Sequence, residues 1–146
     1  MRHGKKNNKT QYSSKRTDFG VSSMVSRLKT VGMLKPMEAL KRADPNKWHY
    51  GQAFDPSKIE SNYSSFIKIL TRLDVEILWM TPKNNGNADS IFTYDASFMT
   101  QNGAILLSPG KSLRKGEEKI HEEFYRNYNI PIIGNLSGLA IAEGGD

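Results

Sequence analysis

The chain has 146 residues, enough for one domain of ordinary size with a hydrophobic core. Its hydrophobic fraction of 37% and mean hydropathy of -0.59 predict a soluble, cytoplasmic protein. No apolar run approaches the roughly 20 residues that cross a bilayer, and no apolar segment follows the basic N-terminus as in a secretory signal. The sequence contains no cysteine, which excludes disulfides, thiolate metal sites and a cysteine nucleophile within these residues.

The net charge of +6 is concentrated at the N-terminus. Six basic residues and one acidic residue lie in 1–18, so the rest of the chain is nearly neutral. Residues 1–20 are rich in Lys, Asn, Ser and Gly, which predicts a disordered basic tail before a folded region at 21–146. A basic tail can touch nucleic acid or a membrane surface, but the neutral body makes nucleic-acid binding the weaker hypothesis.

The first half of the folded region alternates strand and helix signals. Thr30–Lys35 predicts a buried strand, and Val75–Met80 predicts a second one. Residues 37–56 predict a stretch without regular structure, which is typical of a functional loop or lid. A helix is expected to follow Asp55, because a proline suits its first turn and apolar residues recur at helical spacing. This stripe predicts a face packed on the core, made of Ile59, Tyr63, Phe66, Ile67, Leu70 and Leu73.

The second half predicts shorter elements. Ile91–Tyr94 predicts a short strand, and 96–99 with 104–107 predicts a hairpin. A second amphipathic helix is expected at 112–128, with His121 on its outer face or edge, and the last short strands at 130–133 and 139–142. The helix residues expected to face inward are Leu113, Ile120, Phe124 and Tyr128. This order of elements indicates an α/β or α+β class with a mixed sheet.

Two common kinds of site lack support in the sequence. His3, His49 and His121 are far apart, and His121 has no second histidine at the spacing of a zinc pair on a helix. We therefore expect no metal. The Gly-Lys-Ser triplet at 110–112 lacks the first glycine of a phosphate-binding loop, so we expect no nucleotide cofactor.

The carboxylates carry the functional signal. Asp89 and Asp95 flank the strand predicted at 91–94, and Phe92 lies between them. Carboxylates beside an aromatic ring can bind a planar cation by charge-assisted hydrogen bonds and stacking. An aspartate at a strand boundary is also a common turn former or cap, so the residues alone leave both interpretations open.

Two further charged positions are ambiguous in the same way. Arg114 is predicted near a helix start, where the helix dipole favours anions. That position indicates an anionic partner, either Glu117 or a ligand carboxylate. Glu143 precedes a pair of glycines, which marks either a turn or a site.

Taken together, the residues from about Arg27 to Asp146 resemble the guanidino-group modifying enzymes. These include dimethylarginine dimethylaminohydrolase, arginine deiminase and glycine amidinotransferase. The spacings from Asp95 to Arg114 and to Glu143 are most similar to those of the dimethylarginine hydrolases. The matches in chain order are the strand ending at Lys35-Pro36, the Asp89–Asp95 segment, Pro109-Gly110 followed by Arg114 and Glu117, and Glu143-Gly144-Gly145-Asp146.

The resemblance implies a fold and a chemistry. The fold would be a pentein, a five-bladed α/β propeller of repeated ββαβ modules with the active site in its central channel. In the family, a histidine acts as general acid and base while a cysteine thiolate attacks the guanidinium carbon. Hydrolysis of the covalent thiouronium intermediate then releases citrulline, and no cofactor is needed.

The resemblance also implies a role for each site residue. Asp95 would hold the substrate guanidinium, and Asp89 and Phe92 would line the same pocket. Arg114 would pair with the substrate α-carboxylate, and Glu143 would orient the catalytic histidine. The implied ligand is a small guanidino compound, either arginine or a methylated arginine.

Two departures from the family pattern qualify these expectations. Tyr94 stands where the dimethylarginine hydrolases carry a glutamate, which leaves arginine deiminase or amidinotransferase chemistry open. The catalytic histidine and cysteine would lie beyond Asp146, because neither His49 nor His121 matches the family position. We therefore expect 21–146 to be the N-terminal part of a pentein catalytic domain, inactive alone, with a missing C-terminal half or a second copy as partner. A non-catalytic guanidinium-binding or structural module is the alternative hypothesis.

Overall fold

A computed structural model describes residues 18–145, except for 24, 84 and 85. Most of the tail predicted at 1–20, and Asp146 at the end of the acidic cluster, therefore lie outside the described residues. Phe19 packs against the main core cluster, just before the residue at which we expected the folded region to begin. No helix in the described part of the chain is long and apolar enough to cross a membrane.

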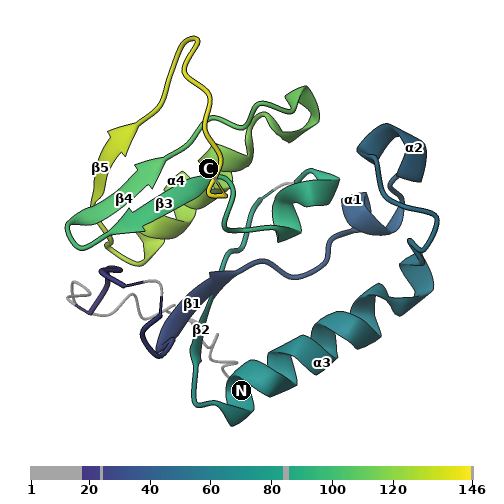
Figure 1. Cartoon of the computed structure of the whole chain (residues 1–146), viewed down its shortest axis with the longest axis horizontal. Helices are drawn as coiled ribbons and strands as arrows, with labels where there is room; N and C mark the ends of the chain where they lie inside the picture. Colours follow the sequence, from purple (N-terminus) through teal and green to yellow (C-terminus); the bar gives the residue numbers. More distant parts are fainter. Residues whose placement is uncertain (1–17, 24, 84–85, 146) are drawn as a thin grey trace, which may run out of the picture.

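The first sheet has two parallel strands, β1 (Thr30–Met33) and β2 (Glu76–Trp79). The connection between them contains the short helices α1 (Glu38–Lys41) and α2 (Pro45–Trp48) and the long helix α3 (Ile59–Arg72), which runs along one side of the molecule (Figure 1). Asp55 accepts a hydrogen bond from the Ser57 amide at 3.0 Å and so caps the turn that leads into α3. Both strands and this helix were predicted.

The second sheet has three strands in the order β3 (Ser97–Thr100), β4 (Gly103–Leu106) and β5 (Ile132–Asn135). β3 and β4 form the predicted antiparallel hairpin, while β4 and β5 are parallel, so the sheet is mixed as expected. Helix α4 (Glu117–Asn127) connects β4 to β5. The chain order β3, β4, α4, β5 is therefore ββαβ.

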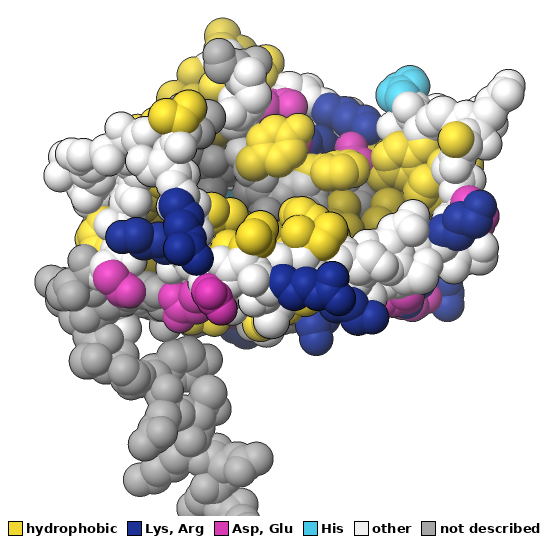
Figure 2. All heavy atoms as spheres, turned by 60° about the horizontal axis from the view of Figure 1, so that its bottom comes forward, with side chains coloured by type: hydrophobic (Ala, Val, Ile, Leu, Met, Phe, Trp, Pro, Cys, Tyr) yellow, Lys and Arg dark blue, Asp and Glu magenta, His cyan; other side chains and the backbone are white. Residues whose placement is uncertain are grey.

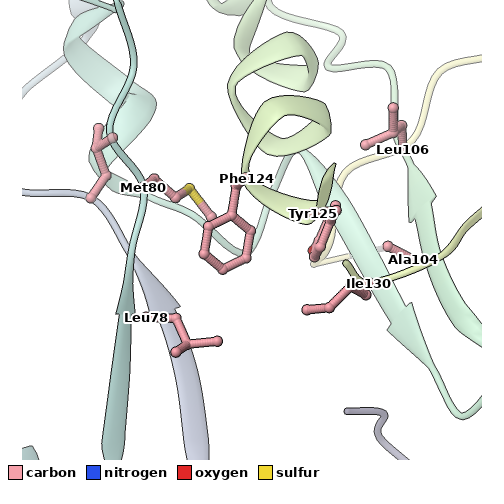
Figure 3. Close-up of a cluster of buried hydrophobic side chains, with 8 residues drawn as sticks. Leu78, Met80, Ala104, Leu106, Phe124, Tyr125 and Ile130 are labelled. Carbon is pink, nitrogen blue, oxygen red and sulfur yellow. The ribbon is translucent and has the colours of Figure 1, made fainter. Parts of the chain in front are cut away.

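One hydrophobic cluster joins the two sheets through α4. In Figure 3 the Phe124 ring lies between Met80 and Leu78 on one side and Tyr125 on the other. A Cβ atom at Gly32 would come within 2.9 Å of the Phe124 ring, so glycine is what allows α4 to approach β1 this closely. The buried members of the cluster are Leu34, Leu78, Met80, Ala104, Leu106, Phe124, Tyr125 and Ile130.

Several predicted elements are wrong. Residues 37–56 are not irregular throughout, because α1 and α2 form there, and Asp44 caps α2 by accepting from the Asn46 amide at 2.9 Å. Ile91–Tyr94 is not a strand, because Ala88–Ile91 forms a 3-10 turn. The expected strand at 139–142 is also absent, and a single bridge from Ala142 to Ser108 takes its place.

Three expectations about helix faces also need correction. The helix expected at 112–128 is interrupted, because Ser112–Arg114 is a separate 3-10 turn and α4 begins only after Gly116, whose φ is 99°. The α3 stripe is only partly buried, since Phe66 and Leu73 are 48% and 57% exposed. His121 is not on an outer face but is 2% exposed.

Candidate functional site

The predicted site residues converge on the guanidinium of Arg114, which is buried at the end of its 3-10 turn. Its Nη1 atom forms an ion pair with Asp95 Oδ2 and lies 4.0 Å from Glu143 Oε2. Its Nη2 atom donates to the backbone carbonyls of Asp89 and Phe92, each at 3.4 Å. The structure thus brings together all five residues that the sequence singled out.

Glu117, the first residue of α4, is the second main partner of Arg114. Arg114 Nε and Nη2 both donate to Glu117 Oε2, at 2.9 Å and 2.6 Å. Gly116 adopts a left-handed conformation that turns the chain between the two residues, so they face each other three positions apart. Glu117 is 2% exposed, and its Oε1 atom has no hydrogen-bond partner among the described residues.

Burial and pairing act in opposite directions on the ionisation of this pair. Burial raises the pKa of Glu117, while the hydrogen bonds and charge of Arg114 oppose that rise. Burial alone would lower the pKa of Arg114, but its bonds to Glu117 and Asp95 raise that pKa above its ordinary value. Arg114 is therefore a permanent cation in this site.

Asp89 is held by a different set of groups. Its Oδ1 atom accepts from the Tyr50 hydroxyl at 2.5 Å, and its Oδ2 atom pairs with Lys111 Nζ at 2.9 Å. Lys111 also donates to the Trp48 carbonyl at 2.9 Å and lies 4.8 Å from the centre of the Trp48 ring. Burial and the neighbouring Asp89 raise the pKa of Tyr50, so the phenol remains protonated. These contacts connect the end of α2 to the site.

The glycine pair after Glu143 determines where this carboxylate lies. The Gly144 amide donates to the Asp95 carbonyl at 3.2 Å, and a Cβ atom at Gly144 would collide with the Tyr94 carbonyl oxygen. Only glycine allows the two segments to lie so close together. Glu143 itself accepts from the Gly110 amide at 3.1 Å, which places its other oxygen toward Arg114.

The network carries more negative than positive groups. Four carboxylates surround two cations, Lys111 and Arg114. Phe92 and Tyr94 are 45% and 63% exposed beside Asp95, so aromatic faces are available at the same place. Figure 2 shows a hollowed face in which hydrophobic side chains lie next to acidic and basic ones. This combination suits a planar organic cation.

A second polar cluster lies in the core and not in the site. Ser97 Oγ is 2.8 Å from His121 Nδ1 and 2.6 Å from Tyr125 Oη, and all three residues are buried. Burial, assisted by the charge of Arg114, lowers the pKa of His121 to about 4, so its imidazole is neutral at neutral pH. These contacts tie β3 to α4. Among the described residues, no group of three acidic or histidine side chains could hold a metal ion.

Comparison with known proteins supports the resemblance. No family model matches the chain. A curated relative, N(G),N(G)-dimethylarginine dimethylaminohydrolase of Pseudomonas aeruginosa, is 29% identical over 98 residues, which are 67% of this chain and 38% of the relative. A dimethylarginine dimethylaminohydrolase variant solved as an adduct with S-methyl-L-thiocitrulline aligns with a TM-score of 0.67 at 26% identity, over 82% of this chain and 46% of that chain.

In sequence and in fold, the chain is similar to members of the guanidino-group modifying enzyme superfamily. A Pseudomonas aeruginosa dimethylarginine dimethylaminohydrolase variant complexed with citrulline shows the same fold, with a TM-score of 0.65 at 24% identity, over 83% of this chain and 46% of that chain. A variant of AgrE complexed with L-arginine also shares the fold, with a TM-score of 0.66 at 17% identity, over 83% of this chain and 18% of that chain. The chain therefore spans less than half the length of these relatives.

The sequence missed three residues of the site and underestimated a fourth. Tyr50 and Lys111 were not expected to contact Asp89, and Trp48 was not expected to contact Lys111. Trp48 and Tyr50 lie in the stretch 37–56 that was predicted to be a functional loop, but nothing in the sequence connects that stretch or Lys111 to Asp89. Glu117 was considered as a partner of Arg114, but its burial and its two hydrogen bonds from Arg114 were not anticipated.

Proposed function

We propose that this chain forms the cation-binding part of an amidine hydrolase, similar to dimethylarginine dimethylaminohydrolase, that acts on the guanidino group of arginine or a methylated arginine. The observation that carries the proposal is the set of groups around Arg114. A guanidinium already fits between Asp95 and Glu117, with the carbonyls of Asp89 and Phe92 in reach. The site therefore has the charge and the planar geometry that a guanidino ligand requires.

Each residue takes a role in this proposal. Asp95 binds the ligand guanidinium, which requires that it release Arg114. Phe92 provides an exposed ring on which the ligand guanidinium can stack, and the buried Asp89 lines the same pocket. Arg114, once released from Asp95, pairs with the ligand carboxylate. Glu143 then orients a catalytic histidine.

The nucleophile has to come from outside these 146 residues. The chain contains no cysteine, and His121 is enclosed by Ser97 and Tyr125 in the core. We propose that residues 21–146 are the N-terminal part of a five-bladed pentein domain and that a C-terminal part supplies the histidine and the cysteine. The thiolate would attack the guanidinium carbon, the histidine would protonate the departing amine, and water would then release citrulline.

The identity of the ligand depends on Tyr94. A neutral phenol stands where the dimethylarginine hydrolases carry a glutamate, and it is exposed beside Gly145. An arginine deiminase or amidinotransferase relative is therefore the alternative within the same superfamily. Tighter binding of arginine than of asymmetric dimethylarginine would favour that alternative, and the reverse order would favour the dimethylarginine hydrolase reading.

Titration calorimetry on the full chain tests the guanidinium site. We expect heat of binding with arginine or asymmetric dimethylarginine, and much less with citrulline, whose ureido group is neutral. Asp95→Asn should abolish binding, because it removes the charge that faces the guanidinium. Asp55→Asn is the matched control, since Asp55 contacts Ser57 and Lys58 in an exposed turn. Absence of heat with every guanidino ligand would contradict the proposal.

A non-catalytic guanidinium-binding module is the second candidate, and the absence of cysteine favours it. Both candidates predict binding of arginine, so binding alone does not separate them. The coding sequence around the chain separates the two candidates. An in-frame downstream histidine and cysteine, followed by citrulline formation from the longer product, would support the enzyme, whereas a longer product that binds arginine without turnover would support the module.

A further inference from the structure

The pairing between Glu117 and Arg114 is incomplete. Two guanidinium nitrogens donate to the same oxygen, Oε2, at 2.9 Å and 2.6 Å. The other oxygen, Oε1, is buried and has no hydrogen-bond partner among the described residues, although the nearby Ser90 hydroxyl lowers the pKa of the Glu117 carboxyl. Arginine and a carboxylate usually form two parallel hydrogen bonds that use both oxygens, and a buried unpaired acceptor is costly. Both groups therefore have a better arrangement available than the one they adopt.

Asp95 is the reason for this incomplete pairing. It holds Arg114 Nη1 directly, so a single guanidinium is shared between two buried carboxylates. The remaining contacts of Arg114, to the carbonyls of Asp89 and Phe92, are long at 3.4 Å and offer little resistance to a shift. In this arrangement one cation faces two negative charges, and the pair of carboxylates lacks a second cation.

We propose that Arg114 has a second position, paired with both oxygens of Glu117, and that Glu117 is the positioning residue that holds it there while a ligand guanidinium replaces it on Asp95. This inference rests on the function proposed above. In the exchange Asp95 trades one guanidinium for another, and the ligand brings the missing positive charge. Each buried carboxylate then has its own cation, and the unpaired oxygen of Glu117 gains a donor.

The exchange also explains how Arg114 can serve a ligand at all. In the observed position Arg114 is 5% exposed and lies against two carboxylates, which would repel an anionic ligand group. Once it leaves Asp95, its Nη1 atom is free to receive the ligand carboxylate. The proposal therefore predicts that Glu117 affects recognition of the carboxylate end of the ligand.

Stability measurements without ligand test the second position directly. After Asp95→Asn, Arg114 can still pair with both oxygens of Glu117, so the unfolding midpoint should fall only slightly. After Glu117→Gln, Arg114 keeps only the ion pair of its Nη1 atom with Asp95 and loses the carboxylate that Nε and Nη2 contact, so the fall should be several times larger. Glu122→Gln is the control, because Glu122 pairs with Arg126 on the exposed side of the same helix. If Asp95→Asn costs as much as Glu117→Gln, Arg114 has no second position.

Calorimetry with arginine and with agmatine, which lacks the carboxylate, tests the positioning role. We expect wild type and Glu122→Gln to bind arginine more tightly than agmatine. Glu117→Gln should reduce that preference by about tenfold or more, the size expected when one charge-assisted hydrogen bond is lost. An equal effect on both ligands, or none, would show that Glu117 is merely structural. If wild type binds neither ligand, the proposed function fails, and the stability comparison still decides whether Arg114 has a second position.

Discussion

Replacement of Arg114 by methionine provides the most direct test of the buried charge network. The side chains of Arg114, Asp95 and Glu117 are only 6%, 10% and 2% exposed, so this is an interior network and not a surface ion pair. Removal of one partner from a buried ion pair costs about 3–5 kcal/mol, because the remaining charge is left without compensation. Stable domains have a free energy of unfolding of only about 5–15 kcal/mol, so the loss should be large at neutral pH.

Lowering the pH should reduce the difference in free energy of unfolding between this variant and the wild type. Burial raises the pKa of Glu117 and Arg114 opposes this rise, so the pKa increases further when Arg114 is removed. A group whose pKa is raised on folding contributes stability below its unfolded pKa and loses it as the pH rises through the folded pKa. His121 acts in the same direction, because the charge of Arg114 helps to lower its pKa in wild type.

Urea unfolding followed by tryptophan fluorescence, at acidic and at neutral pH, measures both effects. Arg126→Met is the matched control, since Arg126 is 71% exposed and pairs with Glu122 on the same helix. Its cost should be at most about 1 kcal/mol and independent of the network. The reasoning is refuted if Arg114→Met costs no more than Arg126→Met, or if its deficit relative to wild type is the same at both pH values.

Three further predictions concern the packing around the site. Gly144→Ala should weaken arginine binding in calorimetry, because the new Cβ collides with the Tyr94 carbonyl and displaces Glu143, whereas Gly51→Ala, with nothing near its Cβ, should have no effect. Phe124→Ala should lower the free energy of unfolding in urea by about 3–5 kcal/mol, since its ring is the centre of the core cluster. Because folding lowers the pKa of His121, its contribution to the stability of the wild type should be present above pH 6.5 and fall as the pH drops toward 4. His121→Asn should remove this pH dependence, which thermal melts at a series of pH values would measure.

The sequence predicted the helices and strands that depend on residues close together in the chain. It did not predict the features that depend on contacts between residues far apart in the chain. The hairpin at 96–107 and helix α3 follow from periodicity and turn residues, and both are confirmed. The strand expected at 91–94 is wrong because Asn87 and Ser90 cap each other and start a 3-10 turn. His121 was placed outside because a polar residue usually is, but Ser97 on β3 satisfies it in the core.

The same distinction holds for the site. The spacing of Asp89, Asp95, Arg114 and Glu143 was sufficient to group these residues, because they keep the order of a known superfamily. Tyr50 was not found because its contact with Asp89 spans 39 residues and depends on how α2 is placed. The position of Arg114 indicated an anionic partner, but not that this partner would include Asp95, the carboxylate expected to hold the ligand guanidinium.

The outer face of the β3–β4–β5 sheet leads to a last prediction, about association. Phe98 on β3 and Ile133 on β5 alternate with residues that face the core, so both point away from α4, and they are 51% and 49% exposed. About half of each side chain is therefore open to solvent, and the chain covers only 46% of a structural neighbour. Exposed apolar sheet faces and open edges favour association.

We therefore expect the 146-residue chain to self-associate with rising concentration in sedimentation velocity. Phe98→Lys should shift the chain toward the monomer, because a charged side chain on this face cannot be buried without a partner. Phe66→Lys on α3 is the matched control, since Phe66 is exposed to a similar degree, 48%, but lies on a different surface. Association that decreases with Phe66→Lys and not with Phe98→Lys would place the contact on α3. A monomer at all concentrations would show that the exposed sheet face does not drive association.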